Sequence, residues 1–103
     1  MKGMGDMLRQ AQMMQKKMQQ IQEELKNRTV EATAGGGMVT VVAKGSQDIV
    51  SIRIDKTVVD PADVDMLQDL VLAAVNDALQ KAREMQASEM SALTGGLKIP
   101  GMF

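Results

Sequence analysis

An unbroken apolar heptad runs through the first quarter of the chain. Its members alternate between three-residue and four-residue spacings: Met4, Met7, Ala11, Met14, Met18, Ile21 and Leu25. Residues three and four apart lie on one side of an α-helix, so this spacing predicts a helix with a continuous apolar seam. Strong helix formers fill the positions between them, and residues 7–25 contain neither glycine nor proline. We expect a helix over residues 5–28, with Met7, Met14, Met18, Ile21 and Leu25 packing against another helix or a second copy.

Three short segments rich in β-branched residues follow this helix. Residues 29–34 and 49–55 alternate polar and apolar side chains, and residues 38–44 read MVTVVAK. Glycine-containing turns separate the three segments, which predicts an antiparallel meander. The three glycines at 35–37 are expected to form a hairpin connection, because no Gly-Lys-Ser/Thr of a phosphate-binding loop follows them.

A second long helix is expected over residues 61–92. Asp60 is a suitable N-cap, Pro61 suits the first helical position, and Asp63 occupies the place of a capping-box acid. Residues 94–96, Thr-Gly-Gly, end the helical pattern and leave a tail over 95–103. The predicted fold class is therefore α+β, with the order α-β-β-β-α in a single domain over residues 1–103.

The predicted lengths suggest how these elements meet. A strand of six or seven residues spans about 20–23 Å, whereas the second helix, at about 32 residues, spans roughly 48 Å. That helix can run back across the sheet and emerge on the side from which the first helix arrives. We expect the two emerging lengths to pair antiparallel and a second copy to cover what remains, which makes the protein a homodimer. Eleven methionines and a single aromatic residue, Phe103, also favour self-association over a lone monomer.

Charge is separated along the chain although its formal net value is only −1. The distal segments 1–17 and 78–103 hold seven basic residues and three acids, whereas residues 18–77 hold five basic residues and ten acids. Lys2, Arg9 and Lys16 recur every seven residues opposite the apolar seam, and Lys17 lies beside them. Such a row suits the phosphates of DNA, since lysine and arginine displace condensed counterions. The alternative is an ordinary solvated helix face without a ligand.

Several classes of chemistry are not supported. The chain has no Cys and no His, which removes thiolate chemistry, disulfides and the commonest acid–base and metal-binding side chain. Asp60, Asp63 and Asp65 match no calcium loop and are better explained as acids opposing a helix dipole. We therefore expect no enzyme, metal, cofactor or small-molecule substrate. The longest apolar run, residues 70–75, is too short to span a membrane, and no signal peptide follows Lys2, so a cytoplasmic protein without a membrane partner is expected.

Four segments of the sequence together resemble those of a known protein family. MLRQAQMMQKKMQQIQEEL, ATAGGGMVTVVAKG, VVDPADVDMLQDLVLAAVNDAL and GGLKIPGMF occur in this order and cover essentially the whole chain. Together they resemble the YbaB/EbfC family of bacterial nucleoid-associated proteins. The resemblance implies a homodimer with helical arms like a pair of tweezers, binding DNA at the nucleoid of the cytoplasm. Carried onto this chain, it points to Lys2, Arg9, Lys16 and Lys17, with Lys81 and Arg83 as a second contribution.

A second function stays open on the sequence. The methionine-rich seam and the apolar tail LKIPGMF could form a protein-interaction module, because methionine surfaces adapt to several partners. In that case the basic row would only be solvated.

Overall fold

The computed structural model describes residues 2–95, and the side chains of residues 3–93. Helix α1 (Lys2–Asn27) leads into strands β1 (Thr29–Ala34), β2 (Val39–Lys44) and β3 (Ile49–Ile54), followed by a short 3₁₀ helix η1 (Lys56–Val58) and helix α2 (Val64–Gly95). The predicted α+β class and the α-β-β-β-α order are confirmed. The expected tail 95–103 lies outside the described residues beyond Gly95.

The sheet is an antiparallel meander with strand order β1-β2-β3. Gly35, Gly36 and Gly37 join β1 to β2 with φ values of 65°, 69° and 92°, a left-handed conformation that favours glycine. An added Cβ at Gly35 would also lie 2.8 Å from the side chain of Leu70. The glycine run is thus a connection that also admits close packing against α2.

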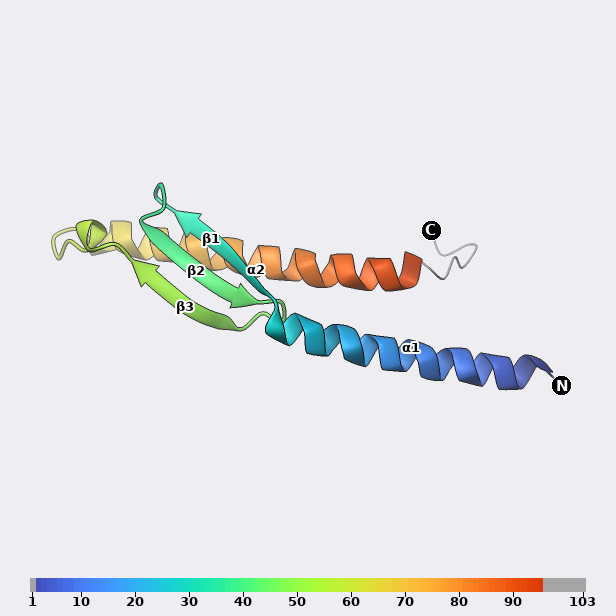
Figure 1. Ribbon diagram of the computed structural model, residues 1–103. Helices are drawn as coiled ribbons and strands as arrows, with labels where there is room; N and C mark the ends of the chain where they lie inside the picture. The colour runs from blue at the N-terminus through green and yellow to red at the C-terminus, as the bar shows by residue number, and fades with distance from the viewer. Residues whose placement is uncertain (1, 96–103) are drawn as a thin grey trace.

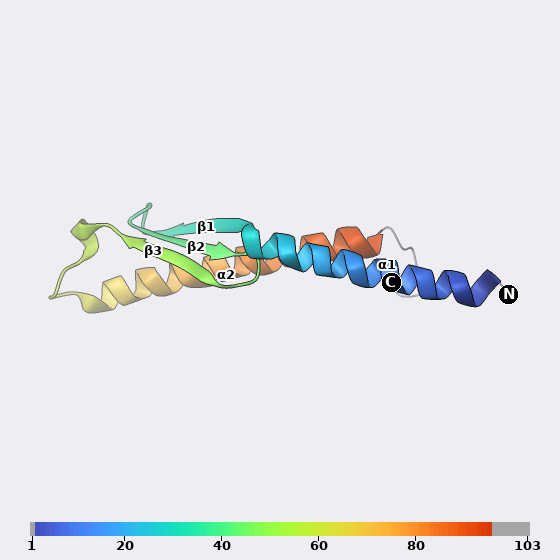
Figure 2. The same ribbon diagram turned by 60° about the horizontal axis from the view of Figure 1, so that its bottom comes forward.

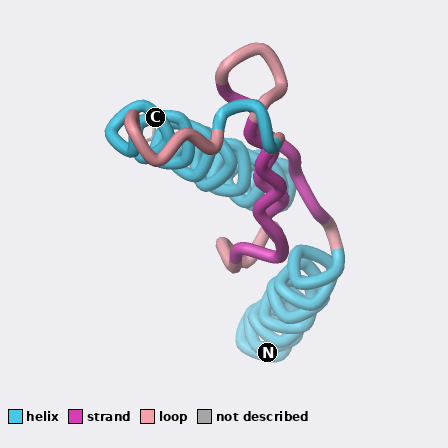
Figure 3. The backbone as a smooth tube through the Cα atoms, turned by 90° about the vertical axis from the view of Figure 1, so that its left-hand side faces the viewer, coloured by secondary structure: helices cyan, strands magenta, loops and turns pink. Residues whose placement is uncertain are grey.

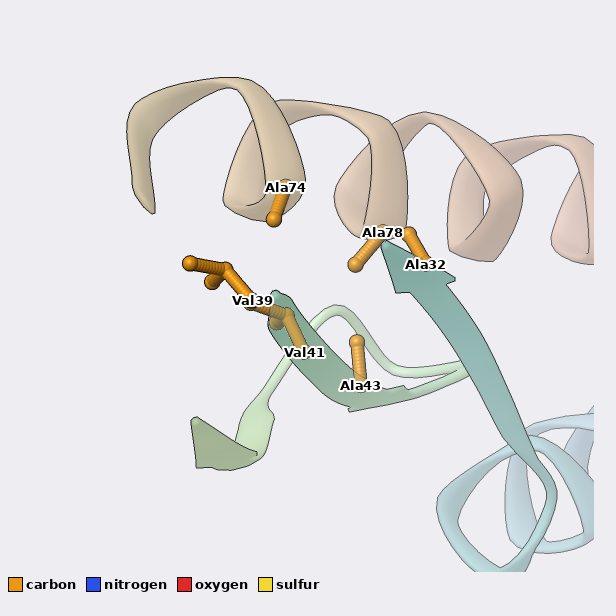
Figure 4. Packing of buried hydrophobic residues seen from close by; sticks show 6 residues of the cluster. All are labelled: Ala32, Val39, Val41, Ala43, Ala74 and Ala78. Atoms are coloured by element: carbon orange, nitrogen blue, oxygen red, sulfur yellow. The ribbon is translucent and has the colours of Figure 1, made fainter. Parts of the chain in front are cut away.

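The core is a thin layer of small side chains between the sheet and α2. Ala74 and Ala78 of α2 are fully buried against the sheet residues Ala32, Val39, Val41 and Ala43 (Figure 4). Alanines four residues apart form a smooth ridge, so the helix can approach the sheet closely. α2 packs on β1 and β2, whereas all six residues of β3 are exposed.

The start of α2 differs from the prediction. The helix begins at Val64, and Asp63 caps it by accepting a hydrogen bond of 3.2 Å from the backbone N–H of Met66. Asp60 belongs instead to a preceding turn, where its carboxylate accepts from the N–H of Ala62 and its carbonyl from the N–H of Asp63. Proline is favoured at the second position of such a turn as well as at the first position of a helix. The Asp60-Pro61 pair is therefore compatible with either structure.

The turn into η1 is held by a local network at the end of β3. The carboxylate of Asp55 accepts hydrogen bonds from the backbone N–H of Thr57 at 2.8 Å and from its hydroxyl at 2.7 Å. The backbone bond and then the hydroxyl bond lower the pKa of Asp55. Because β3 runs away from α1 in the meander, the acidic turn and the start of α2 lie at the end of the sheet opposite to α1.

Both helices project from the same end of the sheet (Figures 1 and 2). α1 arrives there, and the later part of α2 leaves there, so the two ends of the described chain lie on the same side (Figure 1). The molecule measures 74 × 27 × 16 Å. The view along its long axis shows the axes of the two helices inclined to each other (Figure 3), and α1 reaches further from the sheet than α2 (Figures 1 and 2).

Candidate nucleic-acid interface

The basic row of α1 lies on the projecting helix and is open to solvent. Arg9, Lys16 and Lys17 are all exposed. Arg9 and Lys16 are seven residues apart, which separates them by about 10.5 Å along one side of the helix. Within residues 3–93, no carboxylate forms an ion pair with any of these three cations. Lys2 lies in the first turn of α1, but its side chain is outside the described set.

Glutamines flank this row. Gln12, Gln19 and Gln20 are exposed and lie three or four residues from Arg9 or Lys16, so helical periodicity places them beside the cations. Residues 7–22 contain no acid, and the first acids toward the sheet are Glu23 and Glu24. This length of α1 therefore presents cations and uncharged hydrogen-bonding groups without a competing carboxylate, a surface able to contact phosphate and base edges.

Lys81 does not join the α1 cations. Its ammonium group donates a hydrogen bond of 3.0 Å to the backbone carbonyl of Glu31 in β1 and lies 3.9 Å from the carboxylate of Asp77. Residues 78–82 were expected in the projecting part, yet Ala78 and Ala82 are buried. Lys81 therefore lies at the edge of the sheet, with its charge partly offset by Asp77.

Arg83 lies two residues closer than Lys81 to the projecting end of α2. Its side chain is exposed, and its guanidinium donates a hydrogen bond of 3.1 Å to the side-chain oxygen of Gln80. Gln80 in turn donates to the carboxylate of Glu84 at 3.2 Å. Arg83 thus belongs to a local polar network that includes an acid, unlike Arg9 and Lys16.

The apolar seam of α1 is partly covered from Leu25 out to Met14 and is exposed toward the tip of the helix. Leu25 is 2% exposed, Ile21 and Met14 are half-buried, Met18 is 39% exposed and Met7 is 70% exposed. The two helices were expected to pair along their emerging lengths, and within the single chain α1 and α2 are in contact over part of that length. A heptad specifies an apolar face but does not set the angle between two helices that leave a sheet.

A contact that the sequence did not indicate holds the helices at their base. Arg28, directly after α1, forms an ion pair and a hydrogen bond with Glu89 of α2. Gln47 in the turn between β2 and β3 donates a hydrogen bond of 3.1 Å to Gln86 of α2. These partners are 61 and 39 residues apart in the chain, so no local pattern could have revealed them.

The described residues show two further negative features. No group of three acidic residues within residues 3–93 is arranged to hold a metal ion. Among the described helices, none is long and apolar enough to cross a membrane.

A small sheet carrying two long helices, one of which bears an unpaired basic row, defines an α+β protein built around projecting arms. The sequence profile described as the YbaB/EbfC DNA-binding family matches residues 1–97. The chain belongs to this family, which is described as a DNA-binding family.

Individual relatives of the chain support the same family assignment. A protein of Pelotomaculum thermopropionicum named nucleoid-associated protein is 60% identical over 100 residues, covering 97% of this chain and 95% of the relative. A nucleoid-associated protein of Acetivibrio thermocellus is 61% identical over 100 residues, covering 96% and 88%. Among solved structures, the uncharacterized protein HP0035 from Helicobacter pylori is similar with a TM-score of 0.69 and 27% identity, covering 82% of this chain and 86% of that one.

Proposed function

We propose that this protein is a homodimeric nucleoid-associated protein of the cytoplasm that binds double-stranded DNA through the α1 arms, mostly by contacts to phosphate. The observation that carries the proposal is the exposed row of Arg9, Lys16 and Lys17, free of ion pairs within the described residues, on a helix that stands away from the sheet. Cations held in this way are available to replace the counterions of a duplex. Membership of a DNA-binding family supports the same conclusion.

The DNA contacts are assigned mainly to α1. Lys2, Arg9, Lys16 and Lys17 form the principal set, and Arg83 is a secondary contact on α2. Lys81 is given a smaller role than the sequence suggested, because Asp77 and the carbonyl of Glu31 already engage its ammonium group. The family's nucleoid-associated relatives support a location at the nucleoid.

The dimer is proposed to form through β3 and the adjacent flank of α2. Register places Ile52 and Ile54 opposite Val41 and Val39, on the sheet face that α2 covers elsewhere. α2 packs on β1 and β2, so Ile52 remains 46% and Ile54 37% exposed. An exposed apolar edge strand is a surface that another chain can cover.

α2 extends this apolar surface. Leu70 contacts the turn after β1 and Lys81 contacts β1 itself, so both mark the flank of α2 that faces β1. Leu72 follows Leu70 by two residues, which places it on the opposite flank, toward β3, where it is 59% exposed. A second copy seated here would cover both elements and bring a second α1 arm into the assembly.

Charge reversal on α1 tests the DNA-binding proposal. The double variant Arg9→Glu with Lys16→Glu should bind a short duplex roughly tenfold or more weakly in a gel-shift titration, because each substitution replaces a phosphate contact with repulsion. The control, Lys26→Glu with Lys56→Glu, makes the same change in net charge at exposed positions near the sheet. Equal affinities for the two double variants would reject the α1 row as the binding surface.

A further inference from the structure

The side of α2 that packs on the sheet changes from apolar to polar where the helix leaves the sheet. Ala74, Ala78 and Ala82 are spaced by four residues and are fully buried. Gln86 continues this spacing and Glu89 follows three residues later, so both lie on the same side of the helix. Both are half-buried although they are polar. A polar group that loses water in this way needs a protein partner to compensate.

Each of these two polar residues has a partner from a different corner of the fold. Gln47, in the turn between β2 and β3, donates a hydrogen bond of 3.1 Å to the side-chain oxygen of Gln86. Arg28, directly after α1, donates to the carboxylate of Glu89 and forms an ion pair with it. Hydrogen-bonded pairs need a particular distance and direction, whereas a ridge of alanines can slide. The two polar pairs therefore fix the position of α2 along its own axis.

Arg28 also belongs to the corner that joins α1 to the sheet. Its backbone N–H donates to the carbonyl of Glu24 at 3.0 Å, and its carbonyl accepts from the N–H of Gly45 at 2.9 Å. Leu25 is buried and lies directly against Gly45. The last turn of α1 is thus joined to the sheet through Gly45 and to α2 through the side chain of Arg28.

The length of α1 magnifies any change at this corner. α1 has 26 residues and a length of about 39 Å. Tilting it by about 10° at its base would move its tip by about 7 Å. That displacement is about twice the spacing of phosphates along one strand of a duplex, which is roughly 3.4 Å. A small rotation at Arg28 is therefore enough to separate a cation near the tip, such as Arg9, from a phosphate.

We propose that Arg28 is a positioning residue for the α1 arm, which it holds in a fixed direction relative to α2 by binding Glu89. The bond between Gln47 and Gln86 keeps α2 at the same corner, so that Glu89 stays within reach. The side chains of Arg28 and Glu89 are 51% and 30% exposed, and ion pairs with such access to solvent contribute little to stability. The pair acts on the geometry of the arms. Its consequence for DNA rests on the proposed function, whereas the geometry itself does not.

Distances between spin labels test the proposal in the absence of DNA. Because the natural chain has no cysteine, Gln12→Cys and Ala92→Cys introduce one label on each arm at exposed positions. An excess of unlabelled chains limits the measurement to distances within one chain. In this background, Arg28→Glu should shift or broaden the distance distribution by about 4 Å, the displacement of residue 12 for a tilt of about 10°.

The matched control is Lys26→Glu. It makes the same change in charge two residues away, and it breaks only the ion pair of Lys26 with Glu23 within α1, so the distances should not change. Glu89→Ala breaks the proposed contact from its other side and should broaden the distribution as Arg28→Glu does. The exchange Arg28→Glu with Glu89→Arg rebuilds the pair with its signs reversed and should restore the natural distribution. Unchanged distances in both single variants, or an equal shift in Lys26→Glu, would overturn the proposal.

A gel-shift titration measures the consequence for DNA. Arg28→Glu should bind a short duplex about threefold or more weakly than Lys26→Glu, although the two variants have the same net charge, because misdirected arms lose phosphate contacts. Equal affinities beside altered distances would overturn the link between arm direction and DNA binding. If the natural chain bound no duplex, the proposed function would fail, while altered distances in Arg28→Glu and Glu89→Ala would still assign Arg28 its positioning role.

Discussion

Asp63 illustrates how a single carboxylate sets the start of a helix. Its side chain accepts from the backbone N–H of Met66, three residues on, whereas Asp60 accepts only from Ala62 within the preceding exposed turn. Asp63→Ala should therefore lower the free energy of unfolding by about 1 kcal/mol, as for other N-cap residues. Urea denaturation of this variant beside Asp60→Ala measures the difference. A larger loss for Asp60→Ala would restore the helix start expected from the sequence.

Gly45 controls how α1 meets the sheet. A Cβ at this buried position would lie 2.8 Å from the Leu25 side chain and 3.0 Å from the backbone carbonyl oxygen of Leu25. Because the backbone of α1 must shift to make room, Gly45→Ala should destabilise the protein by about 1–3 kcal/mol. Gly5→Ala is the contrasting variant, since Gly5 has open space around it and alanine favours a helix by about 0.8–1.0 kcal/mol. Thermal unfolding should move in opposite directions for the two, and a neutral Gly45→Ala would show that this junction is not tightly packed.

At the scale of elements, β3 is the part of the sheet that the single chain leaves unfinished. Ile52→Asp places a charge at the centre of its exposed apolar face, so we expect light scattering to give the mass of one chain instead of two. Ser51→Asp is the control, since Ser51 is exposed and points to the other face of the same strand. A dimeric Ile52→Asp protein would place the interface elsewhere.

The strands were predicted to within a residue, and the reason is local. β-branched residues in alternation, bounded by glycine turns, define a strand without reference to the rest of the fold. The start of α2 was placed three residues early, because Asp60 and Pro61 serve a turn and a helix start equally well. The angle between the arms was not predictable, since it depends on contacts such as Arg28 with Glu89 that join distant parts of the chain.

The site was only partly accessible from sequence for a similar reason. The row of Arg9 and Lys16 follows from helical periodicity alone, and the structure places both on an exposed helix. The position of Lys81 depends instead on which residues of α2 the sheet covers. Burial of Ala78 and Ala82 keeps Lys81 beside β1 and moves the start of the projecting part to about Arg83. Composition could not reveal this, because it required the packing of α2.

For the whole molecule, charge is distributed along the long axis. The α1 cations lie toward one end, and the acidic turn with Asp55, Asp60 and Asp63 lies at the other, where α2 begins (Figure 1). Under the proposed function, this charge distribution would repel a duplex from the acidic end and attract it to the arms, so a total charge near zero is compatible with DNA binding. We therefore expect the charge distribution to orient the protein on DNA without sequence-specific contacts.

The salt dependence of DNA binding is the most direct test of the proposal that the protein holds DNA through phosphate contacts. If each of two arms supplies four cations, a dimer neutralises about eight phosphates, and the logarithm of the affinity for a short duplex should fall against the logarithm of salt concentration with a slope near −7. Fluorescence anisotropy at several salt concentrations, with the dimer mass checked by light scattering, gives this slope. A slope near zero would mean that the α1 cations do not hold DNA by its phosphates.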